Sequence, residues 1–177
     1  MTRYFAFLRA INVGGHTVKM DLLKSLFEGC GFTDVETFIA SGNVIFDSRI
    51  ADGQKITQTI ETRLKEKLGY QVSTFVRNSE DLSAIINNQP FSESDDANIY
   101  IAFLSAAPDG QARDKLYANN TEDNHFHIQD REVYWRCRTR FSDSIFSGAQ
   151  LEKTLGIPAT IRNRTTLQKM VNKYLLP

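Results

Sequence analysis

The stretch YFAFLRA, residues 4 to 10, returns almost unchanged as YIAFLSA at residues 100 to 106. Tyr, Ala, Phe, Leu and Ala recur in the same order, and Tyr4 and Tyr100 stand 96 positions apart. The first stretch predicts a strand from Arg3 to Ile11. Apolar side chains occupy both alternating faces of each stretch, which is typical of a central strand covered above and below. The chain of 177 residues therefore predicts an internal duplication, with one such strand near the start of each half.

The pattern after the first copy predicts a complete small fold. A glycine-containing loop leads into an amphipathic helix over about residues 20–30, whose inward stripe is expected to include Met20, and a strand hairpin turns at residues 41–43. Apolar residues four positions apart then predict a long helix over residues 56–68, and a strand at residues 72–77 closes the unit. The order β-α-β-β-α-β is the split βαβ arrangement of ferredoxin-like folds.

The second half repeats this outline. A helix over residues 79–88 links the halves, the echo strand follows at residues 99–104, and a second hairpin and a closing amphipathic helix complete the chain. We therefore expect an α+β protein of two fused ferredoxin-like units with mainly antiparallel sheets. The expected units are residues 1–78 and residues 79–177, the second including the linker helix, and we expect them to share one compact core.

Composition narrows the classes of function. Lys plus Arg and Asp plus Glu both number 21, so no net charge draws the chain to nucleic acid or to membranes. No stretch approaches the roughly 18 to 20 apolar residues that span a bilayer, and the apolar run before Arg9 is too short for a signal peptide. Cys30 and Cys137 are far apart and lack redox or metal spacing. We expect a soluble, cytoplasmic protein.

The two copies differ in the loop that follows the repeated strand. Copy one continues INVGGHTVK and copy two continues APDGQAR, and both loops lead into a helix whose start could hold an anion. Gly14 and Gly15 allow close approach of the backbone to a ligand, and Asn12 can both donate and accept hydrogen bonds. Arg9 lies near the strand end, where it can reach the rim of the sheet. Alternatively, the glycines only permit a bend and Arg9 pairs with a surface carboxylate.

Two further strand ends offer similar groups. Ser41, Gly42 and Asn43 join two strands, and Arg162 and Asn163 precede the last helix. Each has an ordinary structural explanation, as a turn in the first case and as a helix N-cap for Asn163. If the fold brings the three stretches together, we expect them to bind a small anionic ligand such as a nucleotide or a phosphorylated metabolite.

The three motifs also carry a resemblance. RAINVGG (9–15), GFTDVETFIASGNVIF (31–46) and GIPATIRNRTTLQKM (156–170) resemble the bacterial family catalogued as domain of unknown function 1697. The resemblance spans the chain and implies an α+β fold of ferredoxin-like parts, without implying an activity, a substrate or a cofactor. It also implies glycine where Ala10 stands and an aromatic residue, usually Trp, where Arg164 stands.

A basic strand provides an alternative function. Tyr134, Arg136, Arg138 and Arg140 would point to one side of a regular strand, as in some ferredoxin-like modules that bind nucleic acid. The same pattern also fits a solvated strand whose arginines meet acidic neighbours. A third alternative is a structural or oligomerisation protein without a ligand.

Chemistry-bearing motifs are otherwise sparse. His125 and His127 would share one strand face, but no third metal ligand stands at a fixed spacing from them, so no metal site is predicted. No nucleophile elbow, phosphate loop or dinucleotide fingerprint occurs in the sequence. The sequence therefore identifies no catalytic residue and no cofactor, and it leaves the oligomeric state open.

Overall fold

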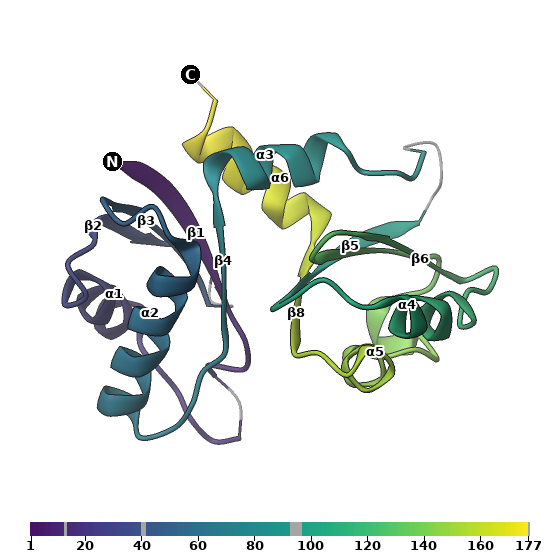
Figure 1. The fold of residues 1–177 in the computed structure, drawn as a ribbon, viewed down its shortest axis with the longest axis horizontal. Coiled ribbons are helices and arrows are strands. Elements are labelled where there is room, and N and C mark those ends of the chain that lie inside the picture. The colour runs from purple at the N-terminus through teal and green to yellow at the C-terminus, as the bar shows by residue number, and fades with distance from the viewer. Residues whose placement is uncertain (13, 40–41, 93–96, 177) are drawn as a thin grey trace. The chain divides into compact units, whose positions relative to one another are not determined.

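The structure is a computed structural model, and it describes residues 1–12, 14–39, 42–92 and 97–176 (Figure 1). The chain divides into two compact units, Met1–Ser83 and Ala84–Pro177. The division falls inside helix α3 (Ser79–Asn87), whereas the sequence suggested a boundary just before that helix. None of the described helices is long and apolar enough to cross a membrane.

The first unit has the predicted order of elements. They are β1 (Thr2–Leu8), α1 (Met20–Glu28), β2 (Thr33–Thr37), β3 (Asn43–Ser48), α2 (Gly53–Leu68), β4 (Thr74–Asn78) and then α3. The strands lie in the order β2-β3-β1-β4, and all neighbours are antiparallel. This order is that of the split βαβ arrangement.

The second unit repeats the first. Its elements are β5 (Asn98–Leu104), α4 (Gly110–Tyr117), β6 (Asn124–Gln129), β7 (Glu132–Cys137), the short 3-10 helix η1 (Phe141–Asp143), α5 (Gly148–Leu155), β8 (Ala159–Asn163) and α6 (Arg164–Tyr174). The sheet order β6-β7-β5-β8 corresponds strand for strand to the first sheet. The predicted α+β fold of two similar units is confirmed. The helix taken for a linker, α3, follows β4 just as α6 follows β8, so the repeat includes a third helix.

Each unit has a hydrophobic core between its sheet and the two helices that cover it, α1 and α2 in the first unit and α4 and α5 in the second (Figure 1). In the first, α1 and α2 place side chains such as Leu26 and Ile56 against Ala6 on β1. Phe5 and Phe7 point to the opposite face of β1, and both are fully buried. Both faces of the central strand are therefore covered, as the double-sided apolar pattern predicted.

Two local predictions in the first unit were wrong. The first strand was expected to run to Ile11, but it ends at Leu8, because Ala10 adopts the left-handed conformation with φ +55°. Met20 was expected on the inward stripe of its helix, yet 40% of it is exposed. Met20 is the first residue of α1, where the helix has not yet completed the turn that packs on the sheet.

Candidate functional site: the glycine loop of the first unit

The loop of residues 9–19 joins β1 to α1 and carries half of the predicted ligand-binding residues. Arg9 is exposed, and its backbone N–H donates to the carbonyl of Ser73 at 2.9 Å. The Oδ1 atom of Asn12 accepts a hydrogen bond from the N–H of Val18 at 2.7 Å. Asn12 therefore fixes the shape of the loop from within.

The backbone conformation of the loop favours glycine at positions 14 and 15. Gly14 has φ +64° and Gly15 has φ +83°, both in the left-handed region that side chains disfavour. A β-carbon added to either glycine would meet no atom within 4 Å, so packing does not demand glycine there. Ala10 is also left-handed, which gives a physical reason for the glycine expected at that position. The loop therefore presents exposed peptide groups in a conformation that only glycine adopts without strain.

Tyr70 anchors the loop from the segment that precedes β4. Its hydroxyl donates to the carbonyl of Ile11 at 3.0 Å, and its ring stacks on His16 with the centroids 4.2 Å apart. Sequence reasoning missed Tyr70 because it lies 59 residues beyond Ile11, and no local pattern connects the two. Both ends of the loop are thereby held.

The turn before β3 packs against this loop. The carbonyl of Gly42 accepts a hydrogen bond from the N–H of Leu8 at 2.8 Å. A β-carbon on Gly42 would come within 3.0 Å of a methyl group of Ile11 and within 3.1 Å of the β-carbon of Leu8. Two of the three predicted stretches therefore lie together, although Ser41 itself is outside the described residues.

Asn43 serves the turn rather than the surface. It is 1% exposed, and its Nδ2 donates to the carbonyl of Phe38 at 3.0 Å. With Asn12 and Gly42 it lines a cavity of only about 10 Å³, which holds at most one water molecule. A ligand at this end of the sheet would therefore rest on the outer surface of the loop.

The charge of the loop is one-sided. Residues 9–19 include the cations Arg9 and Lys19 and no acidic residue, and the nearest carboxylate in the sequence is Asp21 in the first turn of α1. Lys19 is the N-cap of α1, and its side chain makes no capping hydrogen bond. The first N–H groups of α1 therefore keep their partial positive charge. This combination of donors and positive charge suits an anion.

The third stretch belongs to the second unit. Arg162 is 9% exposed, and its Nη1 donates to the hydroxyl of Thr160 at 2.8 Å and to the carbonyl of Ile161 at 2.9 Å. Burial lowers the pKa of Arg162 to about 10. Asn163 is the N-cap of α6, since its Oδ1 accepts from the N–H of Thr165 at 2.7 Å. The helix-cap explanation of Asn163 is confirmed.

The first unit carries the same two residues at the same place. Arg77 on β4 is 3% exposed, and its Nη1 donates to the carbonyl of Val76 at 2.8 Å. Asn78 accepts from the N–H of Asp81 at 2.8 Å, as Asn163 does at the start of α6. The stretches TFVRN and ATIRN are thus a second echo that sequence reasoning missed. Because both copies have it, the Arg-Asn pair belongs to the shared fold.

The basic strand differs from its prediction. The strand β7 ends at Cys137, so the expectation that Arg138 and Arg140 continue its face was wrong, because the chain bends there. Tyr134 is 1% exposed and donates to the carbonyl of Ile85 at 2.8 Å, so its ring offers no stacking surface. Arg136 lies over the ring of Phe91, with its guanidinium carbon 5.6 Å from the centroid.

The histidine pair lies as the strand pattern indicated. His125 and His127 alternate with the buried Phe126 and Ile128 on β6. Within the described ranges, no three His, Cys, Asp or Glu side chains gather closely enough to hold a metal ion.

These features define the class: a duplicated α+β protein whose first unit alone carries a glycine loop. The chain belongs to the family described as "Protein of unknown function (DUF1697)", which matches residues 1–134. The third motif, residues 156–170, lies beyond that match. A solved structure of a conserved bacterial protein from Streptococcus pneumoniae is similar over 97% of both chains, with 27% identity and a TM-score of 0.70. No curated protein matches the sequence.

Proposed function

We propose that the loop of residues 9–19 binds a small anionic ligand, such as a nucleotide or a phosphorylated metabolite. The observation that supports this most directly is the pair of left-handed glycines, Gly14 and Gly15, in a loop that leads to an uncapped helix start. Consecutive backbone N–H groups and a helix N-terminus together form a site that favours negative charge.

The residues of the loop divide into two roles. The backbone N–H groups of Gly14 and Gly15 and of the first turn of α1 donate hydrogen bonds, and Arg9 and Lys19 supply positive charge. Asn12 and Tyr70 hold the loop in shape through the bonds described above. The proposal concerns binding, and no catalytic step is part of it.

Thermal unfolding in the presence of matched ligands tests the proposal. Inorganic phosphate, AMP and a sugar phosphate should each stabilise the protein, whereas adenosine and the free sugar should not. At a hundredfold excess over Kd the melting temperature should rise by about 5 to 10 °C. The double variant Arg9→Ala, Lys19→Ala should lose this response.

A matched control removes the same charge elsewhere in the first unit. Lys65 and Lys67 are exposed on the last turn of α2, and the double variant Lys65→Ala, Lys67→Ala should respond to phosphate as the wild type does. Equal stabilisation of both double variants, or no stabilisation by any anion, would show that the loop is not an anion site.

A further inference from the structure

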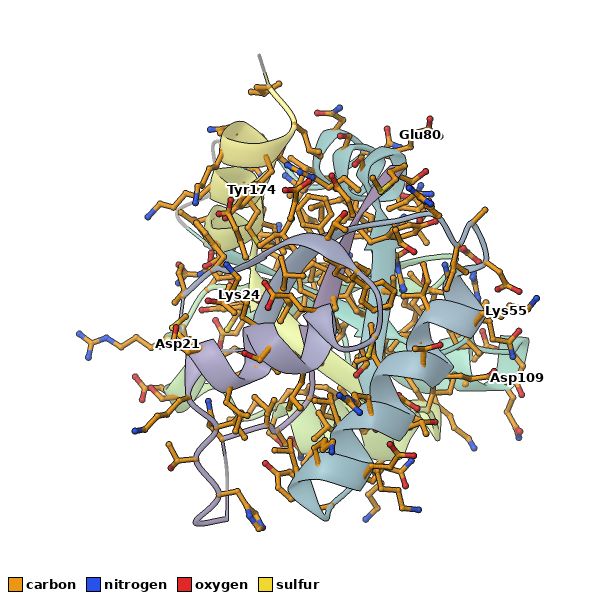
Figure 2. All side chains as sticks on the ribbon, turned by 90° about the vertical axis from the view of Figure 1, so that its left-hand side faces the viewer. Asp21, Lys24, Lys55, Glu80, Asp109 and Tyr174 are labelled. Carbon is orange, nitrogen blue, oxygen red and sulfur yellow. The ribbon has the colours of Figure 1, made fainter. Side chains whose placement is uncertain are left out.

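A groove runs along one side of α2, on the helical layer of the first unit that faces the viewer in Figure 2. Its volume is about 540 Å³, and it is a shallow groove that is open to solvent rather than an enclosed pocket. The lining residues are Ile50, Lys55, Gln58, Thr59, Thr62, Arg63 and Glu66. Except for Ile50, these residues recur every three or four positions, so they form one face of the helix.

Arg63 is the unusual member of this lining. Its Nε atom is hidden from solvent, yet it has no hydrogen-bond partner among the described residues. A buried donor without an acceptor costs about 1 to 3 kcal/mol, and such groups in native proteins usually have a missing partner. Protein atoms cover Nε in this conformation, so a ligand in the groove meets the outer nitrogens of the guanidinium, and Nε gains a partner only if the side chain turns toward the groove.

The surroundings explain the position of the guanidinium but not its unpaired nitrogen. A β-carbon added to Gly29, the C-cap of α1, would stand 2.6 Å from Nη2 of Arg63. The cation therefore lies against the negative end of the α1 dipole, which is a favourable position. The dipole does not supply the hydrogen bond that Nε lacks.

Charge and shape indicate the kind of partner. The flat guanidinium fork matches a carboxylate with two parallel hydrogen bonds. The lining carries two cations, Lys55 and Arg63, and one carboxylate, Glu66, which favours a ligand with a single negative charge. The hydroxyl of Thr59 donates to the carbonyl of Lys55 at 2.8 Å, so it can only accept a hydrogen bond from the ligand, while the hydroxyl of Thr62 can accept or donate.

We propose that the groove along α2 binds a small organic carboxylate, whose oxygens accept hydrogen bonds from Arg63. This site is separate from the glycine loop, and its lining shares no residue with that loop. Cys30 lies close by, with its thiol 4.0 Å from the carbonyl oxygen of Thr59. Burial raises the pKa of the Cys30 thiol, and the charge of Arg63 opposes this. A ligand that neutralises Arg63 should therefore slow alkylation of Cys30.

The experiment compares acids with amides of the same shape on the full chain. Phenylacetate and hexanoate are titrated against phenylacetamide and hexanamide, and binding is followed by the NMR shifts of amides 55–66. The carboxylates should bind and slow the reaction of Cys30 with iodoacetamide, while the amides should do neither. Cys137 is fully buried and should not react, which mass analysis of labelled peptides checks.

Three variants assign the effect to Arg63. Arg63→Gln should raise the Kd of the carboxylates about tenfold or more, the expected value for a hydrogen bond to a charged group. Lys65→Gln removes the same charge from the same helix outside the groove and should bind as the wild type does. Gly29→Ala fits the helical backbone there, but its methyl group displaces the guanidinium and should weaken binding while the charge remains.

Several outcomes would overturn the proposal. These are amides that bind as tightly as acids, inorganic phosphate that binds the groove as tightly as the carboxylates, and a folded Gly29→Ala variant with unchanged affinity. If Arg63→Gln fails to fold, the Gly29→Ala result decides alone. The Arg9→Ala, Lys19→Ala variant should keep its carboxylate affinity, so failure of the loop proposal leaves this one standing.

Discussion

The two copies of the fold differ most in the connection between the first strand and the first helix. In the first unit this connection is the glycine loop of residues 9–19, and the N-cap residue of α1, Lys19, makes no capping hydrogen bond with its side chain. In the second unit it is only residues 105–109, and the carboxylate of Asp109 caps α4 by accepting from the N–H of Ala112 at 2.8 Å. The N–H groups at the start of α4 thus have a side-chain acceptor, whereas the N-cap side chain of α1 supplies none to the N–H groups at the start of that helix.

The two units share one hydrogen bond between the second helix and the start of the last strand. Glu61 on α2 accepts a hydrogen bond from the N–H of Thr74 at 2.8 Å, and Glu152 on α5 accepts from the N–H of Ala159 at the same distance. In each unit the acceptor carboxylate fixes the start of the last strand. Features found in both copies serve the fold, so the loop found in one copy is the stronger candidate for function.

The largest loss of stability should come from substitutions of large aromatic residues in the two cores. Trp135 and Phe46 occupy matching positions, opposite Tyr100 and Tyr4 on the central strands. Only Trp135 has a polar partner, since its Nε1 donates to Oδ1 of the buried Asn124 at 2.8 Å. Trp135→Ala should lower the free energy of unfolding by about 5 kcal/mol, and Phe46→Ala by about 3 kcal/mol.

Urea denaturation followed by far-ultraviolet circular dichroism measures both core variants, because Trp135 is the only tryptophan and fluorescence would be lost with it. A cost for Phe46→Ala equal to or above that of Trp135→Ala would contradict the role assigned to the Asn124 hydrogen bond.

The second largest loss of stability is expected in the turn that packs against the glycine loop. Gly42 combines φ +76° with close contacts, so Gly42→Ala should cost about 2 to 3 kcal/mol. Gly15 has a similar φ but open surroundings, and Gly15→Ala should cost only about 1 kcal/mol. Thermal unfolding of the pair separates packing from backbone strain, and equal losses would mean that the close approach of Gly42 is unimportant.

Sequence reasoning succeeded where the signal was local. The echo of Tyr4–Ala10 and the alternation of apolar residues were enough to predict both sheets, and Asn163 could be read as a helix cap from its neighbours alone. The repeated Arg-Asn pair was equally readable, but comparing only the first strands of the two halves did not reveal it.

Contacts between distant segments could not be predicted in the same way. The stacking of Tyr70 on His16 and the approach of Gly42 to Ile11 depend on how strands pair and where loops fold back. The groove beside Arg63 likewise depends on where Ile50, which precedes α2, lies beside that helix. No periodic pattern in the sequence encodes such placements.

The third effect should depend on pH. Tyr134 stands where Ile45 stands in the first unit, and burial raises the pKa of its hydroxyl to about 12. Above the ordinary tyrosine pKa of about 10, Tyr134 ionises in the unfolded chain but stays neutral in the folded chain. The free energy of unfolding should therefore fall between about pH 10 and pH 12.

Tyr134→Phe separates the hydrogen bond from the titration. Near neutral pH it should cost about 1 to 2 kcal/mol, because the carbonyl of Ile85 loses its hydrogen bond. This difference from the wild type should shrink as the pH rises above 10, as measured by urea denaturation at several pH values. A difference that stays constant up to about pH 12 would show that Tyr134 ionises freely in the folded protein.

The smallest effect is expected when the start of α1 receives an aspartate N-cap like that of α4 in the second unit. Lys19 has the extended backbone of an N-cap, with φ −67° and ψ 145°, so Lys19→Asp should accept a hydrogen bond from the first turn of α1 and stabilise the protein by about 1 kcal/mol. The same change should abolish stabilisation by phosphate, because the carboxylate takes the donors and repels the anion. Asp109→Ala in the second unit should cost about 1 kcal/mol and leave the phosphate response unaltered. If Lys19→Asp gains stability and still responds fully to phosphate, the uncapped helix start is not where the anion binds.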